Sequence, residues 1–427
     1  MLDRTTAPKK NPTGRVSIPQ TQNITLANGA KLIVIDAGTQ EVSKIEIILH
    51  AGTRYQSQAI SARAAISLLS EGTSTKNSQQ IAELFDFYGS FPEHSFDRDF
   101  ATLTLYSTNK YLDQSLGVLA DMIYNPTYPE HELDIFKKKG KQSLIVELEK
   151  VVTIARQNFF STMFGKDHPY GSYATPDEFD TLHRDNIANF HSQYHSSNNC
   201  IIVLAGKVSD KEIKAVEELL GKTNFGNNGT ALNQPFPKSV ISQQKVFSHK
   251  NDALQSAIRI GKELIKRDHE DFPKLMVLNT ILGGYFGSRL MKNIREDKGY
   301  TYGISSTLLP FKETSVFVIG TEVGVDFTAN TLREIYKEIE KLCTEKVPQS
   351  ELDLVKSHLT GEVLRNFDGP FAIAESIASL YEYNNLDYSF FERTIDTINT
   401  VTPEQLIEIA NKYLGQNDFV ESVAGKI

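Results

Sequence analysis

The chain has 427 residues, 40% of them hydrophobic and 23% charged, a mix typical of globular proteins with two or more domains. Its formal net charge of -8 leaves no basic surplus to offset phosphates and argues against a nucleic-acid partner. No apolar run approaches the length needed to cross a membrane, so we expect no membrane span. Two cysteines, Cys200 and Cys343, are too few for a disulfide framework or a thiolate zinc site.

Residues 1–22 are polar and contain three prolines, which predicts an extended N-terminal arm. No hydrophobic segment follows its basic residues, so no signal peptide is expected, and the compartment stays open between cytoplasm and periplasm. Residues 221–245 are rich in Gly, Asn, Pro and Ser and predict a linker. Between arm and linker, hydrophobic periodicity predicts strands at Lys31–Ile35, Lys44–His50, Ala101–Tyr106 and Cys200–Leu204, and helices at Ala59–Ser70, Ser78–Tyr88, Tyr111–Tyr124, Glu130–Glu149 and Asp185–Tyr194.

After the linker the pattern starts again. Pro129-x-x-Glu132-Leu133-Asp134 recurs as Pro348-x-x-Glu351-Leu352-Asp353, and Leu204-Ala-Gly206-Lys-Val208 recurs as Val423-Ala-Gly425-Lys-Ile427, both at an offset of 219 residues. We therefore predict an α+β fold with an internal duplication, in which residues 23–220 and 246–427 form two similar domains. Such a duplicate offers two facing surfaces, which either enclose a ligand cleft or serve structure alone.

One turn of the second half brings two polar side chains together. A helical run with Leu290 and Ile294 stops at Gly299, and a period-two strand pattern follows. This places Arg295 at a helix end and Tyr302 at a strand start, where both can donate hydrogen bonds to one carbonyl oxygen. From spacing alone, an Arg that caps its own helix and a Tyr that packs on the sheet is the commoner arrangement.

Six further segments occur in a set order: Gly72-Thr73, Asn125-Pro-Thr-Tyr-Pro-Glu-His-Glu-Leu133, Asp167-His-Pro-Tyr-Gly171, Leu282-Gly-Gly-x-x-Gly-Ser-Arg-Leu290, Arg295-Glu-x-Lys-Gly-x-x-Tyr302 and Phe367-Asp-Gly-Pro-Phe371. Together they resemble the pitrilysin/insulinase-type zinc peptidases, in the subfamily of mitochondrial and bacterial processing peptidases. The resemblance covers nearly everything from Asn23 to Ile427. It implies a bilobed clamp of two α+β domains that acts as a homodimer or heterodimer.

In such enzymes zinc is held by His-x-x-Glu-His on the helix before the Gly-Thr. This sequence has Arg63-Ala-Ala-Ile66-Ser67 there. Arg63 would repel the metal, Ile66 cannot transfer a proton, and Ser67 is a poor neutral ligand. The family's downstream carboxylate is matched by Glu147, alone a surface or vestigial residue. We therefore expect no metal and no other cofactor in this chain, with zinc in a partner.

Two other histidine segments are candidate sites. His191-Ser-Gln-Tyr-His195 has metal-ligand spacing but no interior Glu, and we interpret it as part of an ordinary helix. His168 lies in the His-Pro-Tyr-Gly loop, where we predict packing and not catalysis.

The resemblance gives Arg295 and Tyr302 a role, because an Arg and a Tyr of the family's C-terminal domain meet the substrate carbonyl. In heterodimeric members one chain carries zinc and the other this pair. Our leading hypothesis is therefore the non-zinc subunit of a peptidase, with a homologous zinc-bearing partner and an unstructured peptide substrate. The resemblance also matches Tyr88, Gly89, Ser90 and Phe91 to an edge strand that accepts an extended peptide, so we predict that they bind substrate. Tyr300 is a further predicted substrate-binding residue, and whether Tyr300 or Tyr302 reaches the cleft stays open. Pro92 would remove one donor from that edge.

Two alternatives remain. The chain could be a degenerate structural subunit, like the peptidase-derived core proteins of a respiratory complex, or a free-standing peptide-binding protein.

Overall fold

The fold is seen in a computed structural model that describes residues 21–227, 236–239, 241, 243–415 and 418–426. The first half forms a mixed sheet with strands β1 (Gln22–Thr25), β2 (Lys31–Asp36), β3 (Val42–Leu49), β4 (Phe91–Phe96), β5 (Ala101–Thr108) and β6 (Cys200–Gly206). Their spatial order is β1-β2-β6-β3-β5-β4. The pair β2 and β6 is parallel and the others are antiparallel.

The second half forms a sheet from strands β7 (Lys245–His249), β8 (Gln255–Leu264), β9 (Thr301–Pro310), β10 (Ser315–Gly324) and β11 (Val420–Gly425). Their order is β7-β11-β8-β10-β9. Among the described strands of this second sheet, only β7 and β11 are parallel. Apart from β1, the two sheets match strand for strand, each with its parallel pair at the same place. The α+β fold of two similar domains is thus confirmed.

Helices cover both sheets. Those of the first half are α1 (Ser61–Ser67), α2 (Ser78–Tyr88), α3 (Leu112–Tyr124), α4 (Glu130–Leu148), α5 (Val151–Phe164), α6 (Arg184–Tyr194) and α7 (Asp210–Val216). Those of the second half are α8 (Phe272–Asn279), α9 (Thr328–Thr344), α10 (Gln349–Arg365), α11 (Pro370–Asn384), α12 (Phe390–Thr400) and α13 (Pro403–Tyr413). None of the helices within the described ranges is long and apolar enough to cross a membrane.

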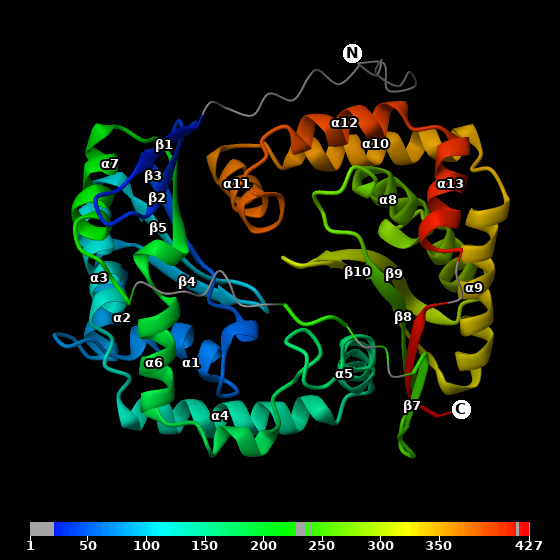
Figure 1. Cartoon of the computed structure of the whole chain (residues 1–427), viewed down its shortest axis with the longest axis horizontal. Coiled ribbons are helices and arrows are strands. Elements are labelled where there is room, and N and C mark those ends of the chain that lie inside the picture. Colours follow the sequence, from blue (N-terminus) through cyan, green and yellow to red (C-terminus); the bar gives the residue numbers. More distant parts are fainter. Residues whose placement is uncertain (1–20, 228–235, 240, 242, 416–417, 427) are drawn as a thin grey trace, which may run out of the picture.

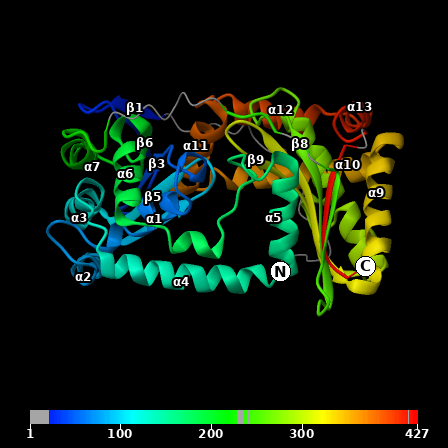
Figure 2. The ribbon, with the colours of Figure 1, turned by 60° about the horizontal axis from the view of Figure 1, so that its bottom comes forward.

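Each half lends a helix to the sheet of the other, which the sequence did not lead us to predict. Helix α5 lies on β8 and β11, where Ala155 meets Ala257 and Ala424 (Figure 2). Helix α11 lies on β6 and β2 (Figure 1), with Ile373 and Ile377 in their common apolar cluster. The exchange follows the repeat, because α4 and α10 begin 219 residues apart, as do α5 and α11. The two halves therefore share their hydrophobic cores.

A buried ion pair of the first half, Arg54–Asp99, also binds a loop of the second half. The loop between β9 and β10 reaches the first half, where the Lys312 backbone N–H donates to Asp99 Oδ2 (3.0 Å). Asp99 Oδ1 accepts from Arg54 Nη1 (2.8 Å) and from the Tyr170 hydroxyl (2.7 Å). Arg54 also pairs with Glu313 of the same loop (3.3 Å). The side chains of Arg54 and Asp99 are only 7% and 2% exposed, so the cation and the anion depend on each other.

The predicted elements of the first half lie where expected, with shifts at their ends. The predicted helix at 59–70 is shorter, since α1 ends at Ser67 and a 3-10 turn, Leu69–Glu71, follows it. The predicted arm lies outside the described residues except at 21–22, and part of the predicted linker lies outside them as well. The domain boundaries themselves stay a prediction.

Candidate functional site

The predicted turn is present between a π-helical segment, Met291–Asp297, and β9. Gly299 has φ of 66°, a left-handed conformation that glycine adopts without strain. Its N–H donates to the Arg295 carbonyl (3.1 Å), and the Tyr300 N–H donates to the Ile294 carbonyl (3.0 Å). The turn thereby sets Arg295 at the end of the helical segment and Tyr302 at the start of the strand.

The Arg295 guanidinium lies between two aromatic rings. Its carbon is 4.8 Å from the ring centroid of Phe286 and 5.0 Å from that of Tyr302. Within the described part of the chain, the Arg295 side chain has no hydrogen bond or ion pair, so it does not cap its own helix there. Phe286 is 62% and Tyr302 90% exposed, an unusual display of apolar surface. In the described structure, neither the Arg295 guanidinium nor the Tyr302 hydroxyl therefore donates a hydrogen bond.

Tyr302 lines a cavity of about 450 Å³ on the face of the second sheet that carries α5. Arg259, Ser305 and Thr307 line the same cavity, as does Gly320 of β10. In Figure 1 this face of the sheet is turned toward the first half, and α8 and α9 cover the opposite face. Tyr302 therefore lies on the face of the second sheet that carries α5.

The period-two pattern predicts that Tyr300 and Tyr302 share one strand face, and this prediction is wrong because Tyr300 lies on the other face. Its ring stacks on Phe327 with centroids 4.7 Å apart, and it packs against the apolar cluster on the helix-covered side. The register between β9 and β10 shifts between Thr321 and Val323, next to the strand start, so simple alternation does not extend to Tyr300.

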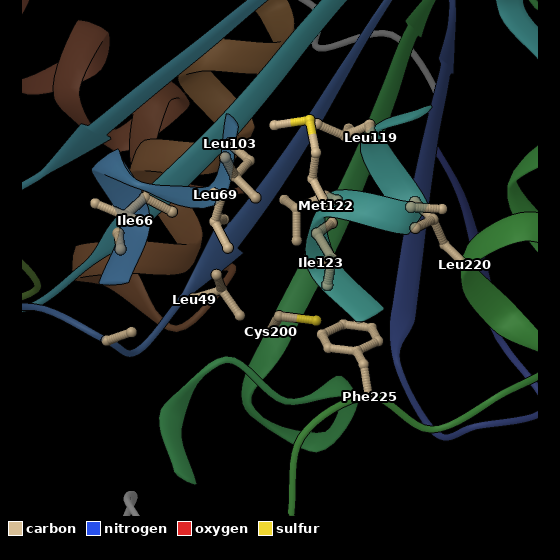
Figure 3. Packing of buried hydrophobic residues seen from close by; sticks show 14 of the residues in the cluster. Leu49, Ile66, Leu69, Leu103, Leu119, Met122, Ile123, Cys200, Leu220 and Phe225 are labelled. Atoms are coloured by element: carbon tan, nitrogen blue, oxygen red, sulfur yellow. The ribbon is translucent and has the colours of Figure 1, made fainter. Parts of the chain in front are cut away.

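Helix α1 carries the counterpart of the zinc motif. Ile66 is 1% exposed and packs in the first core beside Leu69, Leu49 and Leu103 (Figure 3). Ser67 Oγ lies 3.1 Å from His94 Nε2 of β4. Arg63 is half-buried, with its guanidinium 5.5 Å from the Phe136 ring centroid. A fixed cation, a core isoleucine and a serine do not fit a zinc ion.

His94 is a site residue that the sequence reasoning missed. Desolvation and the positive charge of Arg63 lower the pKa of its imidazole. It lies in the edge strand β4, which has too little alternation of apolar and polar residues to predict a strand from the sequence. The described residues contain no group of three or more His, Cys, Asp or Glu side chains arranged to hold a metal ion. One imidazole beside a guanidinium is a poor metal site.

The candidate carboxylate Glu147 is engaged near the end of its own helix. Its side chain is partly exposed and pairs with Lys150 at 2.5 Å, and it accepts from the Thr153 hydroxyl (3.3 Å). The hydrogen bond from Lys150 lowers the pKa of its carboxyl. The arrangement is that of a helix-end surface residue.

The histidines of the two other candidate segments are buried. His191 and His195 have ring centroids 4.9 Å apart, and burial lowers the pKa of His191 to about 4. His168 stacks on Phe164, and its Nε2 lies 3.1 Å from the Pro237 carbonyl oxygen. Both sets therefore contribute packing in the described structure.

The predicted edge-strand segment precedes the edge strand itself. Tyr88 ends α2, and Gly89 closes the helix with φ of 60°. Ser90 is buried, and its hydroxyl lies 3.1 Å from that of Ser107, so it faces the core. The exposed Phe91 begins β4, which pairs only with β5 and leaves its other edge open among the described strands.

The fold defines an internally duplicated α+β protein of two similar domains. Comparison with known families places it. The model "Insulinase (Peptidase family M16)" matches residues 31–176, and "Peptidase M16 inactive domain" matches residues 181–359. The chain belongs to the M16 peptidase family, with an N-terminal domain and an inactive C-terminal domain.

Similar proteins carry contrasting names. The "Uncharacterized zinc protease YmxG" of Bacillus subtilis is 24% identical and the match covers 81% of this chain and 84% of that protein. The "Non-peptidase homolog YmxG" of Helicobacter pylori is 23% identical, covering 83% and 79%.

Two solved structures show the same fold. A peptidase M16 inactive domain structure from Pseudomonas fluorescens superposes with a TM-score of 0.87 at 23% identity, covering 95% of this chain and 98% of that one. A chain from complex III2 of Candida albicans superposes with a TM-score of 0.73 at 18% identity, covering 95% of each.

Proposed function

We propose that this chain is the non-zinc subunit of a heterodimeric zinc metallopeptidase. It supplies Arg295 and Tyr302 to the substrate carbonyl and half of a peptide-binding chamber, and a homologous partner bearing His-x-x-Glu-His holds the zinc. In this proposal residues 23–220 and 246–427 are the two peptidase-like domains, joined by the linker 221–245. The carrying observation is the Arg295 guanidinium, which has no side-chain hydrogen bond or ion pair among the described residues. It lies beside an exposed phenol on the sheet face that carries α5, in a chain whose α1 does not fit zinc.

The chemistry assigned to the pair is stabilisation of developing negative charge. A carbonyl oxygen within reach of both groups would accept one hydrogen bond from a guanidinium N–H and one from the phenol. Arg295 contacts the rings of both Phe286 and Tyr302, which limits the conformers of its side chain. Little reorganisation of this side chain is therefore needed when negative charge develops on the carbonyl oxygen. An extended peptide is held by the open edge of β4 through main-chain hydrogen bonds.

The test is turnover of the reconstituted pair. With the partner present, Arg295→Ala and Tyr302→Phe should each lower kcat by about a hundredfold or more, because each removes one donor. Tyr300→Phe is the matched control, since that ring stacks on Phe327 away from the cavity. Assembly, checked by size-exclusion chromatography, should not change. Full activity of the Arg295 and Tyr302 variants would remove the proposed role.

A second candidate is a scaffold subunit that never contacts substrate. It is favoured by the relative named a non-peptidase homologue, and a stand-alone peptide-binding protein is the related third possibility. A neighbouring gene that encodes an intact His-x-x-Glu-His supports the catalytic pair. Wild-type turnover after both substitutions supports the scaffold.

A further inference from the structure

A second cavity, of about 700 Å³, lies between the lobes beside the degenerate motif. Arg63 of α1, Arg156 and Phe160 of α5, and Phe311 of the β9–β10 loop all line it, as do Arg98 and Tyr173. Its wall thus combines residues of the first half, the exchanged helix and the second half. Its size suits a few residues of an extended chain.

Two arginines of the cavity wall, Arg63 and Arg156, lie there without a paired carboxylate in the described structure. Among the described residues, Arg63 and Arg156 form no ion pair or side-chain hydrogen bond. Burial lowers the pKa of the Arg63 guanidinium, so this cation has lost part of its hydration without gaining a counter-ion. Arg98 differs, because it donates to the Tyr173 hydroxyl (2.7 Å) and to the Tyr170 carbonyl.

The two carboxylates of the wall are already engaged in turns. Asp97 Oδ1 accepts from the backbone N–H groups of Asp99 and Phe100, both at 2.7 Å. Glu178 Oε2 accepts from the backbone and hydroxyl of Thr175, at 2.6 and 3.0 Å. Neither pairs with Arg63 or Arg156 in the described structure, so the cavity keeps two uncommitted guanidinium groups.

We infer that this cavity binds the carboxylate of a peptide, with Arg63 and Arg156 as its donors and the aromatic wall taking a large apolar side chain. Guanidinium is suited to a carboxylate because its fork donates two parallel hydrogen bonds. Phe96, Phe160, Phe179 and Phe311 offer apolar surface beside the charge. A peptide C-terminus with a large apolar last residue would place its carboxylate at the arginines and its side chain against the aromatic rings. An internal Asp or Glu is the other source of a carboxylate. The inference rests on the proposed function only in taking a peptide as the occupant.

Fluorescence anisotropy on the full chain tests the inference without a partner. The probe is an N-terminally labelled hexapeptide, Ala-Ala-Gly-Ala-Leu-Phe, compared as the free acid and as the C-terminal carboxamide. We expect the free acid to bind about tenfold more tightly or better, as hydrogen bonds to charged groups warrant. A third peptide, the carboxamide with Glu at its fourth position, distinguishes a side-chain carboxylate from the chain end.

Matched arginine variants locate the site. Arg63→Gln should reduce the acid-to-amide ratio to near one, and the exposed Arg156→Gln should reduce it without disturbing the helix. Arg333→Gln on the exposed side of α9 is the control and should leave the ratio unchanged. Equal affinities for acid and amide, a ratio that survives both variants, or no binding at millimolar peptide would each overturn the inference. Loss of turnover in the Arg295 variant is scored separately, so the two proposals can fail independently.

Discussion

At the scale of single residues, the informative feature is a guanidinium held between two exposed rings. The Arg295 guanidinium stacks on Phe286 and Tyr302, and the Arg295 side chain makes no hydrogen bond or ion pair within the described residues. Exposed aromatic side chains are costly to display unless something else covers or uses them. The position of Arg295 and Tyr302 followed from a helix stop and a period-two strand. Phe286 did not, because nothing in sequence spacing places residue 286 against residue 295.

Phe286→Ala tests whether stacking positions the arginine. We expect kcat of the reconstituted pair to fall about twofold to fivefold with little change in KM, because an exposed cation–π contact contributes about 0.5–1 kcal/mol. Phe247→Ala, at a partly exposed phenylalanine of β7, is the control. A rise in KM with unchanged kcat would show that Phe286 binds the substrate directly and does not position Arg295.

At the scale of elements, the exchange of α5 and α11 packs a helix of each half on the sheet of the other. The repeat at 219 residues predicted two equivalent halves, and the matching strand orders bear this out. The sequence repeat could not predict that α5 packs on the sheet of the other half. Apolar residues lie on more than one side of this helix, as buried Ala155, Phe160 and Met163 show, so periodicity gave no single partner face.

Ala155→Leu tests the packing of α5. Its side chain would enter a closed contact with Ala257 and Ala424, so we expect a loss of about 1–3 kcal/mol in the free energy of unfolding. Urea denaturation measures this loss, with the exposed Ala329→Leu of α9 as the same chemical change on a free surface. If both variants unfold at the same urea concentration, α5 does not hold the lobes together.

At the scale of the whole molecule, ionisable groups of the first half lie close to Glu382 of the second half. Burial and the neighbouring carboxylates Asp97, Glu46 and Asp99 raise the pKa of Glu382 of α11 to about 8, although Arg267 opposes this. The unfolded chain ionises this group near its ordinary pKa of 4.5, whereas the folded chain keeps the proton until about pH 8. Stability contributed by the protonated group is therefore lost as pH rises through that window.

Glu382→Gln should remove this dependence. We expect the difference in unfolding free energy between variant and wild type to move in favour of the variant from about pH 5 to pH 8. Urea denaturation at several pH values measures it, and Glu392→Gln on the exposed side of α12 is the control. A difference that is constant over this range would show that Glu382 titrates normally in the folded protein.

The central claim is that this chain supplies hydrogen-bond donors to a reaction whose metal lies in another subunit. The most direct measurement is zinc content by mass spectrometry, with peptidase assays, on the chain alone and on its complex with the zinc-bearing homologue. The account predicts no stoichiometric zinc and no cleavage for the chain alone, and roughly one zinc per heterodimer, with activity that chelator abolishes. Stoichiometric zinc and chelator-sensitive proteolysis by the isolated chain would contradict it.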